Sequence, residues 1–77
     1  MSFNYEKLLG RIKEKCGTQD VFAQRMQLGR VSINQRLNNK LDFGAREIKR
    51  ACAILEIPEP EIPIYFFCEQ SSETRTY

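Results

Sequence analysis

The chain contains no histidine. Histidine is the side chain that most often acts as a general base near neutral pH, and it is the commonest metal ligand. Its absence excludes Ser–His and Cys–His nucleophilic pairs. The three cysteines, Cys16, Cys52 and Cys68, form no Cys-x-x-Cys pair, so neither a zinc site nor a disulfide framework is expected. A phosphate-binding glycine loop and paired carboxylates are also missing, and we expect no enzyme, no metal site and no cofactor.

Long apolar runs are missing as well. No run approaches the roughly 18 residues that cross a membrane. The segment Met1–Lys7 lacks the basic and then apolar regions of a signal peptide, so a cytoplasmic location is expected. The 77 residues, 42% hydrophobic and 29% charged, predict one small globular domain. We place this domain at residues 1–69 and expect a flexible polar tail at residues 70–77.

The net charge of +2 is small but unevenly distributed. Residues 21–41 contain four cations and no acid, which gives +4. Residues 56–77 contain one arginine and five glutamates, which gives −4. This distribution predicts that the middle of the chain meets an anion and that its C-terminal part does not.

Apolar residues recur at helical spacing in four segments. The first helix is capped by Asn4 and stopped by Gly17; the others are expected at residues 19–26, from 30 to about 38, and from 42–44 to 55. Prolines predict a loop with at most one helical turn at residues 57–63, followed by a β-prone run at 64–68. The fold class is therefore all-α, a compact domain of four to five helices with a short extended C-terminal segment. The expected core is Leu8, Leu9, Ile12, Phe22, Ala23, Met26, Ile33, Leu37, Ile48, Cys52 and Leu55.

Residues 19–38 have the organisation of a helix–turn–helix motif, in which a glycine-containing turn joins two short helices. Ala23 is small enough for the helices to cross closely, and Ile33 and Leu37 seat the second helix on the core. This pattern resembles the Cro and repressor helix–turn–helix family of bacteriophages, which implies a λ-repressor-like domain. The resemblance extends more weakly over residues 3–67, because the start Phe-x-Tyr-x-Lys-Leu and the end Ile-Pro-x-x-x-Ile-Pro-x-Tyr-Phe-Phe are similar to small Cro-like proteins of temperate phages.

The turn departs from the family pattern at two positions. Gln27 stands where the family usually has glycine, whose backbone tends toward positive φ. Gly29 stands where a serine or threonine usually caps the second helix. A non-glycine residue at positive φ costs about 1 kcal/mol, so the strain of this turn lies either at Gln27 or two residues later at Gly29.

One face of the second helix carries side chains that suit DNA bases. Residues at 31, 34, 35 and 38 lie opposite Ile33 and Leu37, and Arg30 stands at the N-terminal edge. Arginine pairs with guanine, asparagine and glutamine pair with adenine, and an apolar group contacts the thymine methyl. Arg36 points away from this face and is expected to have a structural or partner role. The predicted base-reading or partner-binding face is Arg30, Val31, Asn34, Gln35 and Asn38.

Phosphate contacts need donors and helix N-termini. Thr18 and Gln19 begin the first helix of the motif, so their backbone amides are available. Asn39 and Lys40 follow the second helix. These four residues are the predicted phosphate-binding set.

The aromatic run Tyr65, Phe66 and Phe67 is the predicted association surface. Adjacent side chains of an extended segment point to opposite sides, so one domain surface cannot easily bury both phenylalanines. Three arrangements stay open, in which the run folds back over the core, pairs as a strand with a second copy, or docks on another protein.

Two functions follow from the resemblance, and both place the protein in the lysis–lysogeny switch of a phage, inside a bacterial host cell. In the first, the protein is a homodimer that occupies double-stranded DNA operators. In the second, it is an antirepressor, or modulator of repression, that binds the phage repressor protein. We expect operator binding as the function and keep antirepression as the alternative, which Val31 on the reading face, Gln27 in the turn and the low net charge favour.

Overall fold

The computed structural model describes residues 3–69, which form five α-helices and one short 3-10 helix. The flexible tail expected at residues 70–77 lies outside the described residues. Within residues 3–69, no helix is long and apolar enough to cross a bilayer. The elements are α1 (Glu6–Cys16), α2 (Gln19–Met26), α3 (Arg30–Leu37), α4 (Ala45–Leu55), η1 (Glu59–Glu61) and α5 (Ile62–Phe66).

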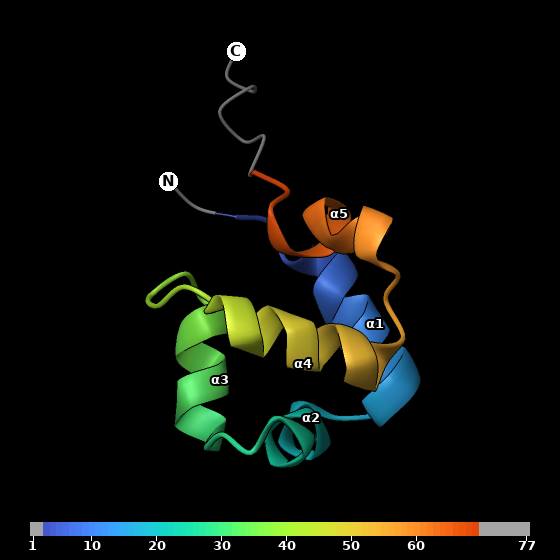
Figure 1. Cartoon of the computed structure of the whole chain (residues 1–77). Coiled ribbons are helices and arrows are strands. Elements are labelled where there is room, and N and C mark those ends of the chain that lie inside the picture. Colours follow the sequence, from blue (N-terminus) through green and yellow to red (C-terminus); the bar gives the residue numbers. More distant parts are fainter. Residues whose placement is uncertain (1–2, 70–77) are drawn as a thin grey trace.

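The long helices α1 and α4 pack against each other, and the shorter helices surround them (Figure 1). Helix α2 contacts α1, α3 and α4, whereas α5 packs on α1 at the opposite end of the molecule. Helix α3 stands at one side, next to the loop that leads into α4 (Figure 1). The all-α architecture therefore matches the fold class expected from the sequence.

The core lies where α1, α2, α4 and α5 meet. Burial of apolar area provides most of the stability of such a domain, at about 25 cal/mol per Å². The buried core residues are Tyr5, Leu8, Ile12, Phe22, Ala23, Met26, Ile33, Ile48, Ala51, Leu55, Ile57 and Phe66.

Three residues of the expected core are less buried in the structure than the sequence predicted. Leu9 is 37% exposed because it lies at the edge of the apolar stripe of α1, beside the fully buried Leu8. Leu37 and Cys52 are half-buried and pack against the rim of the core. Periodicity identifies the inward side of a helix but does not say where a neighbouring helix stops covering it.

Three helices end next to a non-glycine residue in the left-handed region. These residues are Gln27 with φ 62°, Asn39 with φ 64° and Glu56 with φ 57°. The strain of the α2–α3 turn therefore lies at Gln27, and the alternative placement at Gly29 is wrong because its φ is −72°. Asn39 follows the end of α3, and asparagine is one of the few residues besides glycine that tolerate this conformation.

The left-handed residue Glu56 was not anticipated, and two cations of α1 stabilise it. Arg11 Nε donates to the Leu55 carbonyl at 2.9 Å, and Arg11 Nη2 donates to the Glu56 carbonyl at 2.8 Å. Lys15 Nζ lies 3.1 Å from Glu56 Oε1. Positive side chains at a helix C-terminus satisfy carbonyls that have no partner within the helix.

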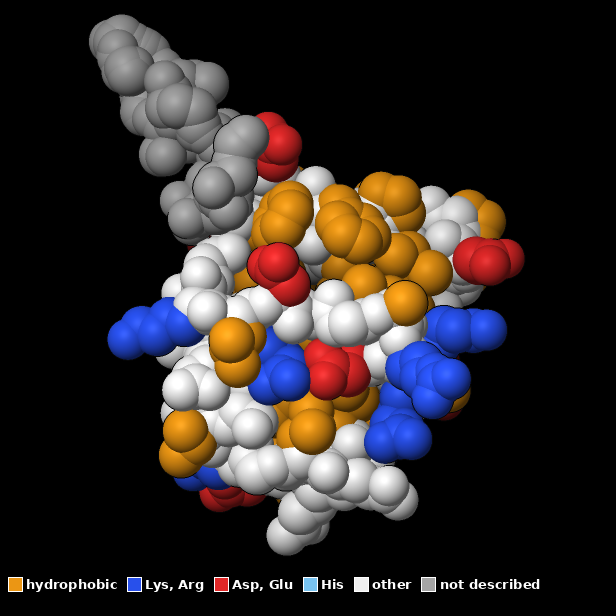
Figure 2. Space-filling view, turned by 60° about the vertical axis from the view of Figure 1, so that its left-hand side comes forward, with side chains coloured by type: hydrophobic (Ala, Val, Ile, Leu, Met, Phe, Trp, Pro, Cys, Tyr) orange, Lys and Arg blue, Asp and Glu red, His pale blue; other side chains and the backbone are white. Residues whose placement is uncertain are grey.

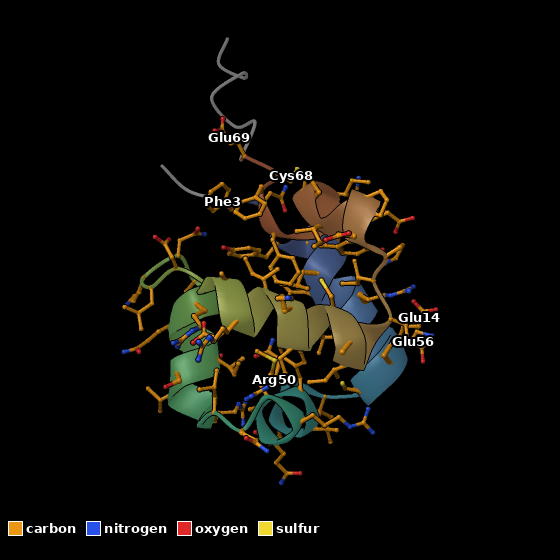
Figure 3. The ribbon with its side chains drawn as sticks, viewed as in Figure 1. Phe3, Glu14, Arg50, Glu56, Cys68 and Glu69 are labelled. Carbon is orange, nitrogen blue, oxygen red and sulfur yellow. The ribbon has the colours of Figure 1, made fainter. Side chains whose placement is uncertain are left out.

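The C-terminal run is helical, so the expectation of a β-prone segment at residues 64–68 is wrong. Pro63 stands in the first turn of α5, where a missing N–H costs no hydrogen bond. The extended backbone is limited to the residues just after α5. There, the Asn4 amide donates to the Cys68 carbonyl at 2.6 Å, and Phe3 forms an antiparallel bridge with Glu69 (Figure 3).

Candidate functional site

The segment α2–turn–α3 has the helix–turn–helix geometry that the sequence predicted. Thr18 caps α2, because its Oγ1 accepts a hydrogen bond from the Val21 amide at 3.2 Å. After Met26, the amide of Leu28 donates back to the Ala23 carbonyl at 3.0 Å and closes the turn. Ala23 is 3% exposed, so the two helices cross over a side chain that occupies little space.

A charged network fixes α3 to the N-terminus of α4. Arg36 donates from Nε to Glu47 Oε1 at 2.8 Å and from Nη2 to Glu47 Oε2 at 3.0 Å. Its Nη1 donates to the Ser32 carbonyl at 2.9 Å, and Glu47 Oε1 also accepts from the Gly44 amide at 2.9 Å. The hydrogen bonds and positive charge of Arg36 hold the pKa of Glu47 below its usual value, with a further contribution from the Gly44 amide and against the effect of burial. The structural role expected for Arg36 is therefore confirmed.

The opposite side of α3 presents the candidate face, which we call the α3 face and define as Arg30, Val31, Asn34, Gln35 and Asn38. Val31 is 68% exposed, the highest value among the exposed large apolar side chains of residues 3–69. Asn34 and Gln35 are half-buried, whereas Asn38 is exposed and its Nδ2 donates to the Asn34 carbonyl at 2.8 Å. Figure 2 shows that much of the surface on this side is neither apolar nor charged.

Arg30 does not stand free at the N-terminus of α3. Its Nη1 lies 2.8 Å from Asp20 Oδ1, and both side chains are about 60% exposed. Asp20 is the second residue of α2, so the pair joins the N-terminal ends of the two helices. The only cation of the α3 face is therefore paired with a carboxylate of the same motif.

The four candidate phosphate contacts differ in their surroundings. Thr18 is exposed and Gln19 is half-buried at the start of α2, and Lys40 is exposed after α3. Asn39 has another role, because its Oδ1 accepts from the Phe3 amide at 2.8 Å and its Nδ2 donates to the Phe3 carbonyl at 3.0 Å. The side chain of Asn39 therefore joins the end of α3 to the N-terminal segment.

The aromatic run near the C-terminus divides between core and surface. Phe66 is 1% exposed and belongs to the core, so its inclusion in the association surface is corrected. A helix turns Phe66 and Phe67 about 100° apart rather than 180°, which lets one side chain enter the core while the next stays at the surface. Tyr65 is half-buried and Phe67 is 50% exposed.

Sequence reasoning missed a row of cations on the solvent side of α4. Arg46, Lys49 and Arg50 are exposed, and none of them has a carboxylate partner within residues 3–69. Arg50 Nη1 donates to the Met26 carbonyl at 3.1 Å, between α4 and the end of α2 (Figure 3). Their i, i+3, i+4 spacing places them on one face of a helix and could have predicted this row. The net charge of residues 42–55 is only +1, because Asp42 and Glu47 offset two of the cations in the sum.

The part of the chain described by the structure contains no group of three or more histidine, cysteine or acidic side chains that could hold a metal ion. Burial raises the pKa of the Cys52 thiol, and the nearby charge of Glu59 raises it further. Cys52 is therefore a poor nucleophile, because the thiolate is the reactive form.

The chain matches a family model and a solved structure. The family model, described as "Protein of unknown function (DUF739)", matches residues 1–69. The solution structure of the modulator of repression (MOR) of the temperate bacteriophage TP901-1 from Lactococcus lactis is similar to it at 45% identity and a TM-score of 0.78. The similarity covers 87% of this chain and 90% of that chain. No curated protein matches. The all-α fold and the resemblance to small phage regulators are therefore confirmed.

Proposed function

Because the chain belongs to the DUF739 family and is similar in structure to a phage modulator of repression, we propose that it is a non-enzymatic regulator of the lysis–lysogeny switch of a temperate phage. The neighbouring protein is a modulator of repression, and the two chains correspond over nearly their whole lengths. The protein would act in the cytoplasm of the bacterial host, where repressor and operators are found.

We further propose that it acts on the phage repressor protein through the α3 face. The ion pair of Arg30 with Asp20 is the observation that carries this proposal. Binding to the DNA backbone depends on cations that replace counterions at the phosphates. Asp20 holds the only cation of the α3 face in an ion pair, and its carboxylate stands at the start of α2, where helix–turn–helix proteins approach phosphate.

The composition of the α3 face also suits a protein partner. Val31, 68% exposed, stands beside polar amides, and an apolar centre surrounded by polar groups is typical of protein interfaces. Antirepression then has a simple physical form, because a repressor that is held by this face is no longer free to occupy its operator.

The test measures binding of the full chain to the repressor of the same phage by calorimetry. Val31→Asp should weaken binding at least about tenfold, because it buries an unpaired charge in the interface. The matched control is Leu9→Asp, which places the same charge at a partly exposed apolar position on α1. Equal affinities for the Val31 variant and the unmodified protein would refute the α3 face as the contact surface.

Operator binding is a second candidate, and the intact helix–turn–helix geometry supports it. Asn34, Gln35 and Asn38 carry amides that can pair with adenine, and Lys40 is exposed beside them. A mobility-shift assay with the switch region of the phage, with and without the repressor, separates the two functions. Retarded DNA with this protein alone supports operator binding, whereas release of a repressor–DNA complex supports antirepression.

If operator binding holds, Asn34→Ala or Gln35→Ala should cost about 1–3 kcal/mol of discrimination between operator and unrelated DNA. Lys40→Ala should weaken binding to all sequences and reduce the salt dependence. Unchanged discrimination in the asparagine and glutamine variants would exclude base reading by the α3 face.

A further inference from the structure

The N-terminal segment and α5 meet at one end of the molecule (Figure 1). A small pocket lined by residues of these two segments lies there. Its volume is about 220 Å³, smaller than the roughly 300–1,000 Å³ of pockets that hold drug-sized ligands. It has the size for one side chain rather than for a metabolite. We call it the aromatic pocket; its lining residues are Phe3, Tyr5, Asp42, Phe43, Ile48, Phe66 and Phe67.

Three pairs of rings around the aromatic pocket are nearly perpendicular, whereas Phe3 and Tyr5 are tilted at 50° with centroids 6.2 Å apart. Phe3 and Phe67 meet at 82° with centroids 5.9 Å apart, and Tyr5 and Phe43 meet at 83° with centroids 5.6 Å apart. Phe43 and Phe66 meet at 82°. These three pairs are T-shaped, edge-to-face contacts and not parallel stacks. Tyr5 and Phe66 are buried, so the ring surface that a ligand can reach belongs to Phe3, Phe43 and Phe67. The faces of aromatic rings carry negative electrostatic potential.

Asp42 adds a full negative charge to this pocket. It is exposed and has neither an ion-pair partner nor a side-chain hydrogen bond within residues 3–69. Burial raises the pKa of Tyr5, and the charge of Asp42 raises it further, which indicates that the carboxylate lies close to the phenol. The pocket therefore combines ring faces with an unpaired carboxylate, and both attract a cation.

Phe67 lines the pocket, and two further exposed apolar side chains stand close to lining residues in the chain, Leu41 next to Asp42 and Ile64 three residues before Phe67. Phe67 is 50% exposed, Ile64 is 45% exposed and Leu41 is 46% exposed. Figure 2 shows apolar side chains gathered over this end of the molecule, with an acidic side chain at their border. A partner that lays its surface here covers apolar area around a site that favours positive charge.

We propose that the aromatic pocket binds the guanidinium group of an arginine side chain that a partner protein presents. A guanidinium stacks on aromatic faces and donates two parallel hydrogen bonds to a carboxylate, which matches the residues of this pocket. The carboxylate repels phosphate, so the partner on this surface is a protein and not DNA. The assignment does not depend on the proposed function, because it concerns residues outside the α3 face.

The test uses nuclear magnetic resonance of the full-length protein with methylguanidinium as the probe. Saturable shift changes are expected at Tyr5, Asp42, Phe43 and Phe67. Methylurea has the same planar shape without the charge, and it should bind about fivefold or more weakly. Equal binding of the two probes would overturn the cation site.

Two variants test the parts of the site separately. Asp42→Asn should lower the affinity for methylguanidinium about fivefold, whereas the control Glu59→Gln, at another exposed carboxylate, should leave it unchanged. Phe67→Leu keeps the apolar area but removes a ring face, and it should lower the affinity about two- to fivefold. Phe67→Tyr should retain binding. An unaffected Asp42→Asn variant with an intact fold would refute the proposal.

The source of the arginine is tested with three further measurements. N-acetylarginine methylamide should bind at least as tightly as methylguanidinium if the pocket admits a side chain from another protein, and its exclusion would overturn that part. Pocket resonances that depend on protein concentration would assign the occupant to a second copy instead. A higher probe affinity in Arg75→Gln would assign it to the chain's own Arg75. Both latter results overturn the assignment to a partner.

Discussion

The contact between Arg36 and Glu47 determines how α3 is held, and Glu47→Gln is the sharpest test of that reasoning. The substitution keeps the shape of the side chain but removes its charge, so one of the two oxygens that accept from Arg36 becomes an amide donor. The side chains of Arg36 and Glu47 are only 14% and 28% exposed, which limits screening by water. We expect a loss of about 1–2 kcal/mol in the free energy of unfolding at pH 7.

Thermal denaturation measures this loss directly. In a domain of this length, 1 kcal/mol corresponds to a fall in Tm of about 4–8 °C. The control is Glu14→Gln, whose carboxylate is 64% exposed and lies 3.5 Å from Arg11, and it should change the stability by less than about 0.5 kcal/mol. Equal losses in the two variants would refute the role assigned to Glu47.

The pH dependence gives a second, independent check. Arg36 lowers the pKa of Glu47 in the folded state from its usual value of 4.5, so the unfolded chain binds this proton first as the pH falls. The stabilisation is therefore complete above about pH 4.5 and is lost as the pH falls through the folded pKa. The difference in stability between the unmodified protein and Glu47→Gln should shrink over this range, and a constant difference between pH 7 and pH 3 would contradict the mechanism.

Four further substitutions test the turns and the helix crossing by thermal denaturation. Ala23→Leu should overpack the α2–α3 crossing by about 1–3 kcal/mol, and an unchanged Tm would contradict the packing described for Ala23. Gln27→Gly should raise the stability by about 0.5–1 kcal/mol because it relieves the left-handed backbone, whereas Gly29→Ala, where no neighbour lies within 4 Å, should not be destabilising. Asn39→Ala should cost about 1–3 kcal/mol, since it removes two hydrogen bonds to Phe3 and leaves alanine at positive φ; a loss below 0.5 kcal/mol would show that this link is unimportant.

Helices α1 to α4 and the helix–turn–helix motif could be predicted from the sequence, because the signals that define them are local. Thr18 caps α2 through an amide three residues away. The small Ala23 on α2 and the apolar Ile33 on α3 indicate where the two helices cross. Gln27 stands in the turn, at the position where the family usually has glycine, and its φ is 62°. Each signal acts within one or two helical turns, so it can be recognised without knowing how the chain is arranged in space.

The contacts between distant segments could not be predicted from the sequence and are known only from the tertiary structure. The contact between Asn39 and Phe3 joins residues 36 positions apart, and the pair of Arg11 with the Leu55 carbonyl spans 44 positions. The C-terminal run became a helix because Phe66 could enter the core against α1, a choice that β-propensity alone did not predict. The ion pair of Arg30 with Asp20 and the lining of the aromatic pocket each combine side chains from different segments. These side chains meet only when burial of the common core brings the segments together.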